Sequence, residues 1–167
     1  MRQPGYREPV PLIRRRLLLV APVAGVLALG GCAATVPARV APHGTDPVCA
    51  SVVLAMPDSL GDGLPQRDTN AQATTAWGST AAPVVLRCGV EPLDPTTEHC
   101  QSVETPGGPS VDWVVIEGAD GWTFTTYGRE PAVELYVPAQ VAQERSTAFV
   151  DQLGSAVSLT EQIRSCV

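Results

Sequence analysis

The sequence contains no lysine. All eleven of its basic residues are arginines, and five of these precede Leu17. From residue 32 onward, six arginines stand against sixteen aspartates and glutamates, which gives that part a formal net charge of −10. Nucleic acids and anionic lipid headgroups bind basic surfaces, so this charge balance argues against both as direct partners of the domain.

Histidine is almost as scarce, since only His43 and His99 are present. We expect His43 in a linker and His99 in a solvated turn, so neither is a strong candidate for a catalytic base. The sequence also has no Gly-x-Ser-x-Gly motif for a serine hydrolase, no P-loop and no complete EF-hand loop. We therefore expect a protein that is not an enzyme and that has no cofactor and no metal.

The chain has five cysteines, and their positions predict two kinds of modification. Cys32 is the predicted lipidation site, which leaves an even set, Cys49, Cys88, Cys100 and Cys166, for two disulfides in an oxidising compartment. Of the three possible connectivities we expect Cys88 with Cys100 and Cys49 with Cys166. A zinc site is the alternative, but the sequence has no CxxC pair to support it.

The first 32 residues have the pattern of a bacterial lipoprotein signal. Arginines precede an apolar run from Leu17 to Leu29, and Leu29-Gly30-Gly31-Cys32 is typical of a lipobox. Thirteen apolar residues are too few for a membrane-spanning helix, which needs about 20. We expect an exported protein that is lipid-anchored to the outer face of the cytoplasmic membrane; Arg14-Arg15-Arg16 leaves general secretion and twin-arginine export both open.

The predicted domain organisation has three parts. Residues 1–31 form the lipoprotein signal peptide, residues 32–45 a lipidated flexible tether, and residues 46–167 a single disulfide-stapled globular domain. The tether assignment depends on two prolines and the absence of any hydrophobic period.

The domain is expected to begin with a short helix. Thr45 or Asp46 caps it, Pro47 occupies its first turn and Pro57 ends it. Residues 58–66 contain turn signals, and 72–77 favours either a strand or a short helix. Strands are expected at residues 84–90, 101–104, 112–117, 122–127 and 132–137, the last three forming an antiparallel meander.

The end of the sequence favours helices. A helix is expected from Gln140 to Leu153, Gly154 interrupts it, and Ser158 to Glu161 matches a capping box before a last helix that carries Cys166. The predicted fold class is α+β: an antiparallel sheet of about four to five strands packed with an N-terminal helix and C-terminal helices.

A series of short motifs follows the chain in order: Asp46-Pro47-Val48-Cys49, Ala76-Trp77-Gly78, Leu86-Arg87-Cys88-Gly89-Val90, Val111-Asp112-Trp113, Thr126-Tyr127-Gly128-Arg129 and Pro131-Ala132-Val133-Glu134. Together they resemble one family, the DUF3515 lipoproteins of actinobacteria. That family has no assigned function, so the resemblance implies an exported lipoprotein domain and supplies no catalytic residue, cofactor or substrate.

Aromatic and arginine residues are the remaining candidates for a functional surface, because tryptophan, tyrosine and arginine are enriched where proteins bind one another. The alternative is that the tryptophans belong to the core and that Arg87 or Arg129 pairs with Glu134 on the sheet. The candidate binding surface consists of Trp122, Tyr127, Arg129, Arg87 and Trp77.

These patterns favour a non-catalytic binding or scaffolding lipoprotein. Its expected partners are the membrane, through the lipid anchor, and an envelope protein or cell-wall component, with no nucleic acid. The alternative is an envelope enzyme acting on a cell-wall or peptide substrate, which would place His99 near a serine or a pair of carboxylates in one cleft. A purely structural envelope protein would show neither feature.

Overall fold

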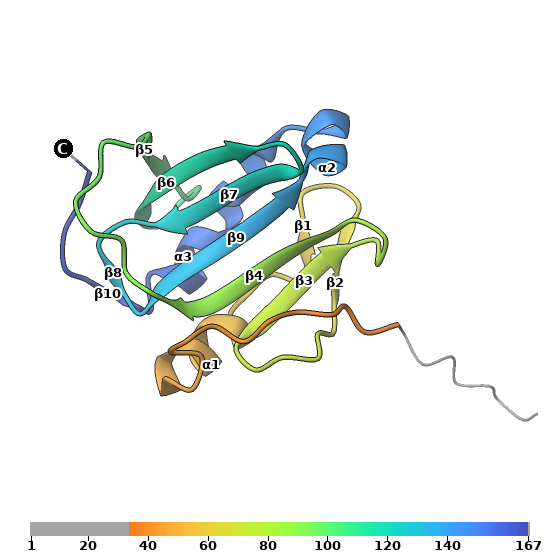
Figure 1. Ribbon diagram of the computed structural model, residues 1–167, viewed down its shortest axis with the longest axis horizontal. Coiled ribbons are helices and arrows are strands. Elements are labelled where there is room, and N and C mark those ends of the chain that lie inside the picture. Colours follow the sequence, from red (N-terminus) through yellow and green to blue (C-terminus); the bar gives the residue numbers. More distant parts are fainter. Residues whose placement is uncertain (1–33, 167) are drawn as a thin grey trace, which may run out of the picture. The chain divides into compact units, whose positions relative to one another are not determined.

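The computed structural model describes residues 34–166, which form a large antiparallel sheet with short helices packed on it (Figure 1). The chain divides between Gly31 and Cys32 into two units, and every described residue belongs to the second. The predicted signal peptide and the predicted lipidation site, Cys32, lie outside the described residues.

Within residues 34–166, the main sheet has eight strands in the order β1-β2-β3-β4-β9-β7-β6-β5, every neighbouring pair antiparallel. A separate two-stranded ribbon pairs β8 with β10. The bounds are β1 Ser59–Leu60, β2 Leu64–Arg67, β3 Thr74–Gly78, β4 Pro83–Val90, β5 Cys100–Glu104, β6 Ser110–Gly118, β7 Gly121–Thr126, β8 Arg129–Glu130, β9 Ala132–Pro138 and β10 Glu161–Gln162.

The predicted antiparallel sheet and its meander of β6, β7 and β9 are confirmed, but four to five strands was too few. The predicted turn around residues 58–66 is the hairpin of β1 and β2, in which Leu60 pairs with Leu64. Strands of two and four residues are too short to show the alternation that identifies a strand in sequence. The open segment at 72–77 is largely β3.

Alternation along the longer strands gives the sheet two different faces. On β4, Val84, Leu86 and Cys88 are buried on one face, whereas Val85 and Arg87 point to the other. The helices and the main hydrophobic core lie on the first face, which we call the helix face. We call the opposite side the outer face.

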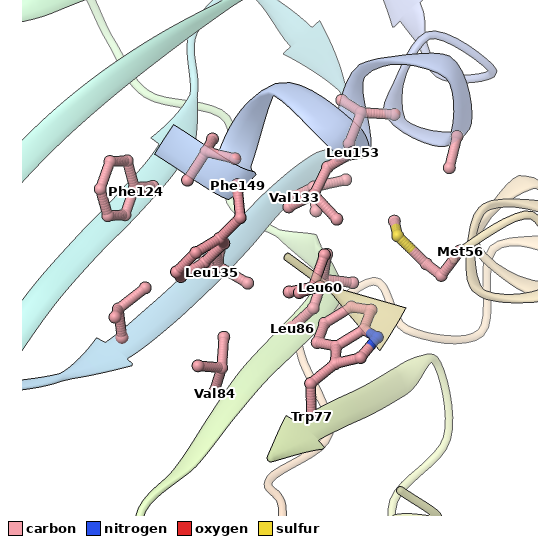
Figure 2. Close-up of a cluster of buried hydrophobic side chains, with 14 of the residues drawn as sticks. Met56, Leu60, Trp77, Val84, Leu86, Phe124, Val133, Leu135, Phe149 and Leu153 are labelled. Carbon is pink, nitrogen blue, oxygen red and sulfur yellow. The ribbon is translucent and has the colours of Figure 1, made fainter. Parts of the chain in front are cut away.

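The core joins the helix face of the sheet to the helices. Figure 2 shows Leu86 and Leu135 from the sheet near Phe149 and Leu153 from a C-terminal helix. Trp77 is fully buried in the same cluster, and its indole Nε1 donates a hydrogen bond to the Pro57 carbonyl at 2.8 Å. A buried indole needs such a partner because its N–H loses water on folding.

The first helix, α1 (Pro47–Leu54), confirms the predicted start. Asp46 is the N-cap, and its carboxylate accepts a hydrogen bond from the Val48 N–H at 2.9 Å. Such a cap stabilises a helix by about 1 kcal/mol. Cys49 and Val52 of α1 are buried against the sheet and α3.

Two short helical segments replace the single helix predicted from Gln140 to Leu153, and a third begins at Gly154, which was expected to interrupt the helix. They are α2 (Ala139–Glu144), the 3-10 helix η1 (Thr147–Leu153) and α3 (Gly154–Val157). The first ends at Glu144, with the extended Arg145 as its C-cap, because Ser146 starts a new turn in which its hydroxyl accepts a hydrogen bond from the Ala148 N–H at 3.1 Å.

The last predicted helix, after Ser158, is wrong. The Ser158 hydroxyl donates to the Ser155 carbonyl at 2.8 Å, within the preceding turn, and residues 161–162 form β10. β10 pairs with β8, so Gln162 lies opposite Arg129. Pairing with a distant strand has overridden a local helix signal.

Four cysteines form two disulfides, as predicted, but the predicted pairing is wrong. The bonds join Cys49 to Cys88 and Cys100 to Cys166. Cys88 lies on the helix face and Cys100 on the outer face, so the predicted Cys88–Cys100 bond would have to cross the sheet. The sequence separations are 39 and 66 residues, and closing loops of that size contributes about 4 kcal/mol each in the chain-entropy model.

The segment before α1 packs on the outer face of the sheet. Val36 is fully buried, its N–H donates to the Asp68 carbonyl at 2.8 Å, and its carbonyl accepts from Asn70 at 3.3 Å. Further along, the His43 N–H donates to the Gly89 carbonyl at 2.8 Å. We call residues 36–45 the N-terminal strap; Figure 1 shows it in orange, leading to α1.

The predicted flexible tether is therefore wrong from residue 36 onward, and the domain begins before Asp46. Its attachment depends on backbone hydrogen bonds and two isolated buried side chains, Val36 and Ala41, which produce no hydrophobic period. Gly89 makes the contact possible, because a Cβ there would collide with the backbone of His43.

The C-terminal segment, residues 160–166, crosses the opposite end of the outer face. The N–H groups of Ile163 and Arg164 donate to the Gly128 carbonyl at 2.7 and 3.3 Å. Gly128 has φ +66°, and a Cβ there would collide with the carbonyl of Arg164. The Cys100–Cys166 bond joins this segment to the first residue of β5. Figure 1 shows the segment in dark blue, running from β10 toward the end marked C.

Gly128→Ala should destabilise the domain more than Gly107→Ala. Both glycines have similar positive φ values, +66° and +70°, but a Cβ at Gly107 meets nothing within 4 Å. We expect a loss of about 1 kcal/mol for G107A from backbone strain and about 2–4 kcal/mol for G128A, measured by urea unfolding of the oxidised domain. Equal losses in the free energy of unfolding would show that the close packing of the C-terminal segment on Gly128 does not stabilise the domain.

Candidate functional site

Between the two terminal segments, the outer face of the sheet presents two rows of side chains. Residues directly opposite one another in antiparallel strands share a face, so the registers define each row. One row contains Val114, Thr125, Glu134 and Arg87, and the next contains Ile116, Thr123, Tyr136 and Val85.

The N-terminal strap forms a wall beside these rows and encloses a shallow cavity of about 390 Å³. We call this cavity the outer-face groove. It is lined by Pro37, Ala38 and Arg39 from the strap and by Val85, Arg87 and Tyr136 from the sheet.

The charged residues that line the groove are Arg39 and Arg87, and Arg87 pairs with the neighbouring Glu134. Arg87 donates to one carboxylate oxygen of Glu134 through Nη2 at 2.6 Å and through Nε at 3.0 Å. Their side chains are 28% and 23% exposed, so solvent screens the pair only in part. The Tyr136 hydroxyl donates to the Asp120 carbonyl at 2.8 Å, which fixes the ring in the second row. Arg39 adds an exposed positive charge on the wall.

Of the five predicted surface residues, Arg87 lies in the groove, where it pairs with Glu134, one of the pairings that the structural alternative allowed. Trp77 is wholly in the core, as the structural alternative had it. Arg129 is 4% exposed and lies beneath the C-terminal segment, where Nη1 donates to the Thr160 carbonyl at 2.8 Å. Burial lowers the pKa of the Arg129 guanidinium, and the nearby negative charge of Asp112 opposes that shift.

The structure does not bring Trp122 and Tyr127 into one patch. Trp122 points to the helix face and packs on the core, whereas Tyr127 follows the strand and lines a hollow on the outer face. Five residues of extended chain also separate them by about 16 Å. The predicted binding surface of five residues is therefore divided among the core, the C-terminal segment and the groove.

His99 lies in the same hollow as Tyr127, next to the Cys100–Cys166 disulfide. This hollow has a volume of about 380 Å³, and its one carboxylate comes from Glu98. The cleft expected of an envelope enzyme, with His99 near a serine or two carboxylates, is not formed in the part of the chain described here.

Two further observations on residues 34–166 concern metal binding and membrane spanning. These residues contain no group of three or more His, Cys, Asp or Glu side chains placed to hold a metal ion. Their helices are all too short to cross a membrane.

A family model described as "Protein of unknown function (DUF3515)" matches residues 17–165. The chain belongs to this family. Curated proteins and solved structures show no significant match to the DUF3515 chain.

In this DUF3515 domain the groove residues outside the predicted set are Val85, Tyr136 and Pro37 to Arg39. On β9, Glu134 and Tyr136 alternate with buried valines and a leucine, a sequence pattern typical of a strand with one solvent-facing side. The strap carried no comparable signal. Its contribution to the groove depends on the contacts of Val36 with the loop at Asp68 and of His43 with Gly89 in β4.

A double-mutant cycle on Arg87→Met and Glu134→Gln should give a coupling free energy of about 0.5–1 kcal/mol. The two hydrogen bonds to one oxygen favour coupling, and partial exposure limits it. Urea unfolding of the wild type, both single variants and the double variant measures it. Additive effects would mean that the ion pair contributes no net stability and that Arg87 is available to a ligand.

Proposed function

We propose that this DUF3515 protein is a lipid-anchored, non-catalytic binding protein of the cell envelope, which holds another envelope protein in the outer-face groove. The observation that carries the proposal is the groove itself, with a wall formed by the N-terminal strap and a floor formed by two ordered rows of the sheet. The resemblance to actinobacterial lipoproteins supports a position in the cell envelope.

Two features support lipid anchoring at the outer face of the cytoplasmic membrane. The family match begins at residue 17, so the predicted apolar signal region and Cys32 fall within the pattern that defines the family. The remaining cysteines are paired in two disulfides, as is usual in exported proteins and rare in the cytosol.

The shape and chemistry of the groove favour a polypeptide ligand. Small-molecule sites enclose most of their ligand, whereas this cavity is a shallow depression on an open sheet face. Its apolar residues, Val85 and Pro37, lie beside Arg39 and Arg87, and Glu134 adjoins the groove as the partner of Arg87. The groove therefore offers hydrocarbon contact together with charged groups. Protein interfaces commonly combine these features.

Cys32→Ser should abolish lipidation. In an actinobacterial host supplied with a labelled fatty acid, we expect the wild-type full-length protein to carry the label in the membrane fraction and the C32S variant to carry none. Cys166→Ser is the matched control, because it removes a disulfide cysteine and should keep the label. An unlabelled wild type, or a labelled C32S variant, would contradict the lipid anchor.

Photo-crosslinking in cells tests the groove. A benzophenone amino acid at Tyr136, inside the groove, should capture one reproducible envelope protein, and the same group at the exposed Ser155 should not. Arg39→Glu should reduce capture several-fold with an unchanged unfolding midpoint, because Arg39 is an exposed residue of the groove wall. Equal capture from both positions, or capture that is insensitive to R39E, would contradict the proposal.

A further inference from the structure

The N-terminal strap leaves a very short connection between the domain and the predicted lipid. Only three residues separate Cys32 from Val36, which is fully buried and hydrogen-bonded to the loop at Asp68 and Asn70. A fully extended chain advances at most about 3.6 Å per residue, so Val36 lies within about 14 Å of Cys32. A domain of this length has a radius of gyration of about 14 Å, so the connection is shorter than the domain is wide.

A lipid at Cys32 therefore determines which side of the domain faces the bilayer. The loop that holds Val36 also borders the end of α1. Asp68 and Thr69 line a hollow of about 460 Å³ together with Val53 and Leu54. Leu54 is 86% exposed, a high value for a leucine. Val36, four residues after the predicted lipid attachment, and the exposed Leu54 side chain thus flank the same loop.

The helix itself carries no charge, whereas Asp58, Arg67 and Asp68 line the hollow beside it. The domain is acidic overall, and anionic phospholipids repel most of such a surface. Residues 47–57, which include all of α1, contain no charged residue, and residues 33–38 contain none either. An uncharged helix with an exposed leucine is suited to the headgroup region of a bilayer.

We propose that the end of α1 rests on the phospholipid surface, with Leu54 inserted among the headgroups. This inference depends on the proposed lipid anchor at Cys32. It also places the outer-face groove close to the membrane, because Pro37 to Arg39 line the groove and directly follow Val36. The groove would then receive a segment of a partner protein that lies near the bilayer.

Fluorescence quenching on vesicles tests the orientation. The lipidated full-length protein is prepared with Leu54→Cys or Ile116→Cys and labelled with nitrobenzoxadiazole, since the four domain cysteines are disulfide-bonded. Ile116 is the matched control: it is 49% exposed and lies on β6, four strands from β3, about 19 Å across the sheet. The vesicles contain phosphatidylcholine, phosphatidylglycerol and a doxyl-labelled phosphatidylcholine.

We expect a blue shift and about twofold quenching at position 54 and neither at position 116. A flexible Gly-Ser insertion after Ala33, long enough to span the domain, should reduce the quenching at position 54. Flotation of the vesicles reports the anchor separately. Protein that does not float contradicts the lipid anchor. Protein that floats with position 54 unquenched, with both positions quenched alike, or with quenching unaffected by the insertion overturns the orientation.

Discussion

Close backbone contact at two glycines is the constraint on which the outer face depends. The N-terminal strap passes over Gly89 and the C-terminal segment over Gly128, and in both places the neighbouring backbone occupies the position of a Cβ. Each crossing is secured by a disulfide: Cys88 adjoins Gly89, and Cys166 follows the residues that contact Gly128. The two chain segments are thereby held on the outer face of the sheet, with a part of that face left between them. The groove belongs to this part.

The short motifs that carry the resemblance to DUF3515 lie mainly at these attachments. Asp46 caps α1, Cys49 bonds to Cys88, and the carboxylate of Asp112 accepts a hydrogen bond from the Cys166 N–H at 2.8 Å. Arg129, buried beneath the C-terminal segment, holds the Thr160 carbonyl. These residues hold the helix and the C-terminal segment on the sheet. Their roles are structural, so the motifs identify the domain but do not indicate a reaction.

Sequence patterns predicted the helices and strands that are determined by interactions between residues close together in the chain. The helix cap at Asp46 acts within a few residues, and the alternation of Val133, Leu135 and Val137 reflects one sheet face. The same reasoning failed where a distant partner competes. Residues 158–161 match a helix start, yet Glu161 and Gln162 pair with β8. The candidate site was predicted only in part, because Trp122 and Tyr127 are near in sequence but belong to opposite faces.

The sequence by itself determined the family, the antiparallel character of the sheet, the first helix and the pairing of four cysteines into two disulfides. Tertiary structure alone decided which cysteines pair, where the strap lies and which charged residues meet. Those outcomes depend on strand order and register, which bring Arg87 opposite Glu134 across 47 residues. Periodicity and capping act over one or two turns, so they carry no information about contacts at that separation.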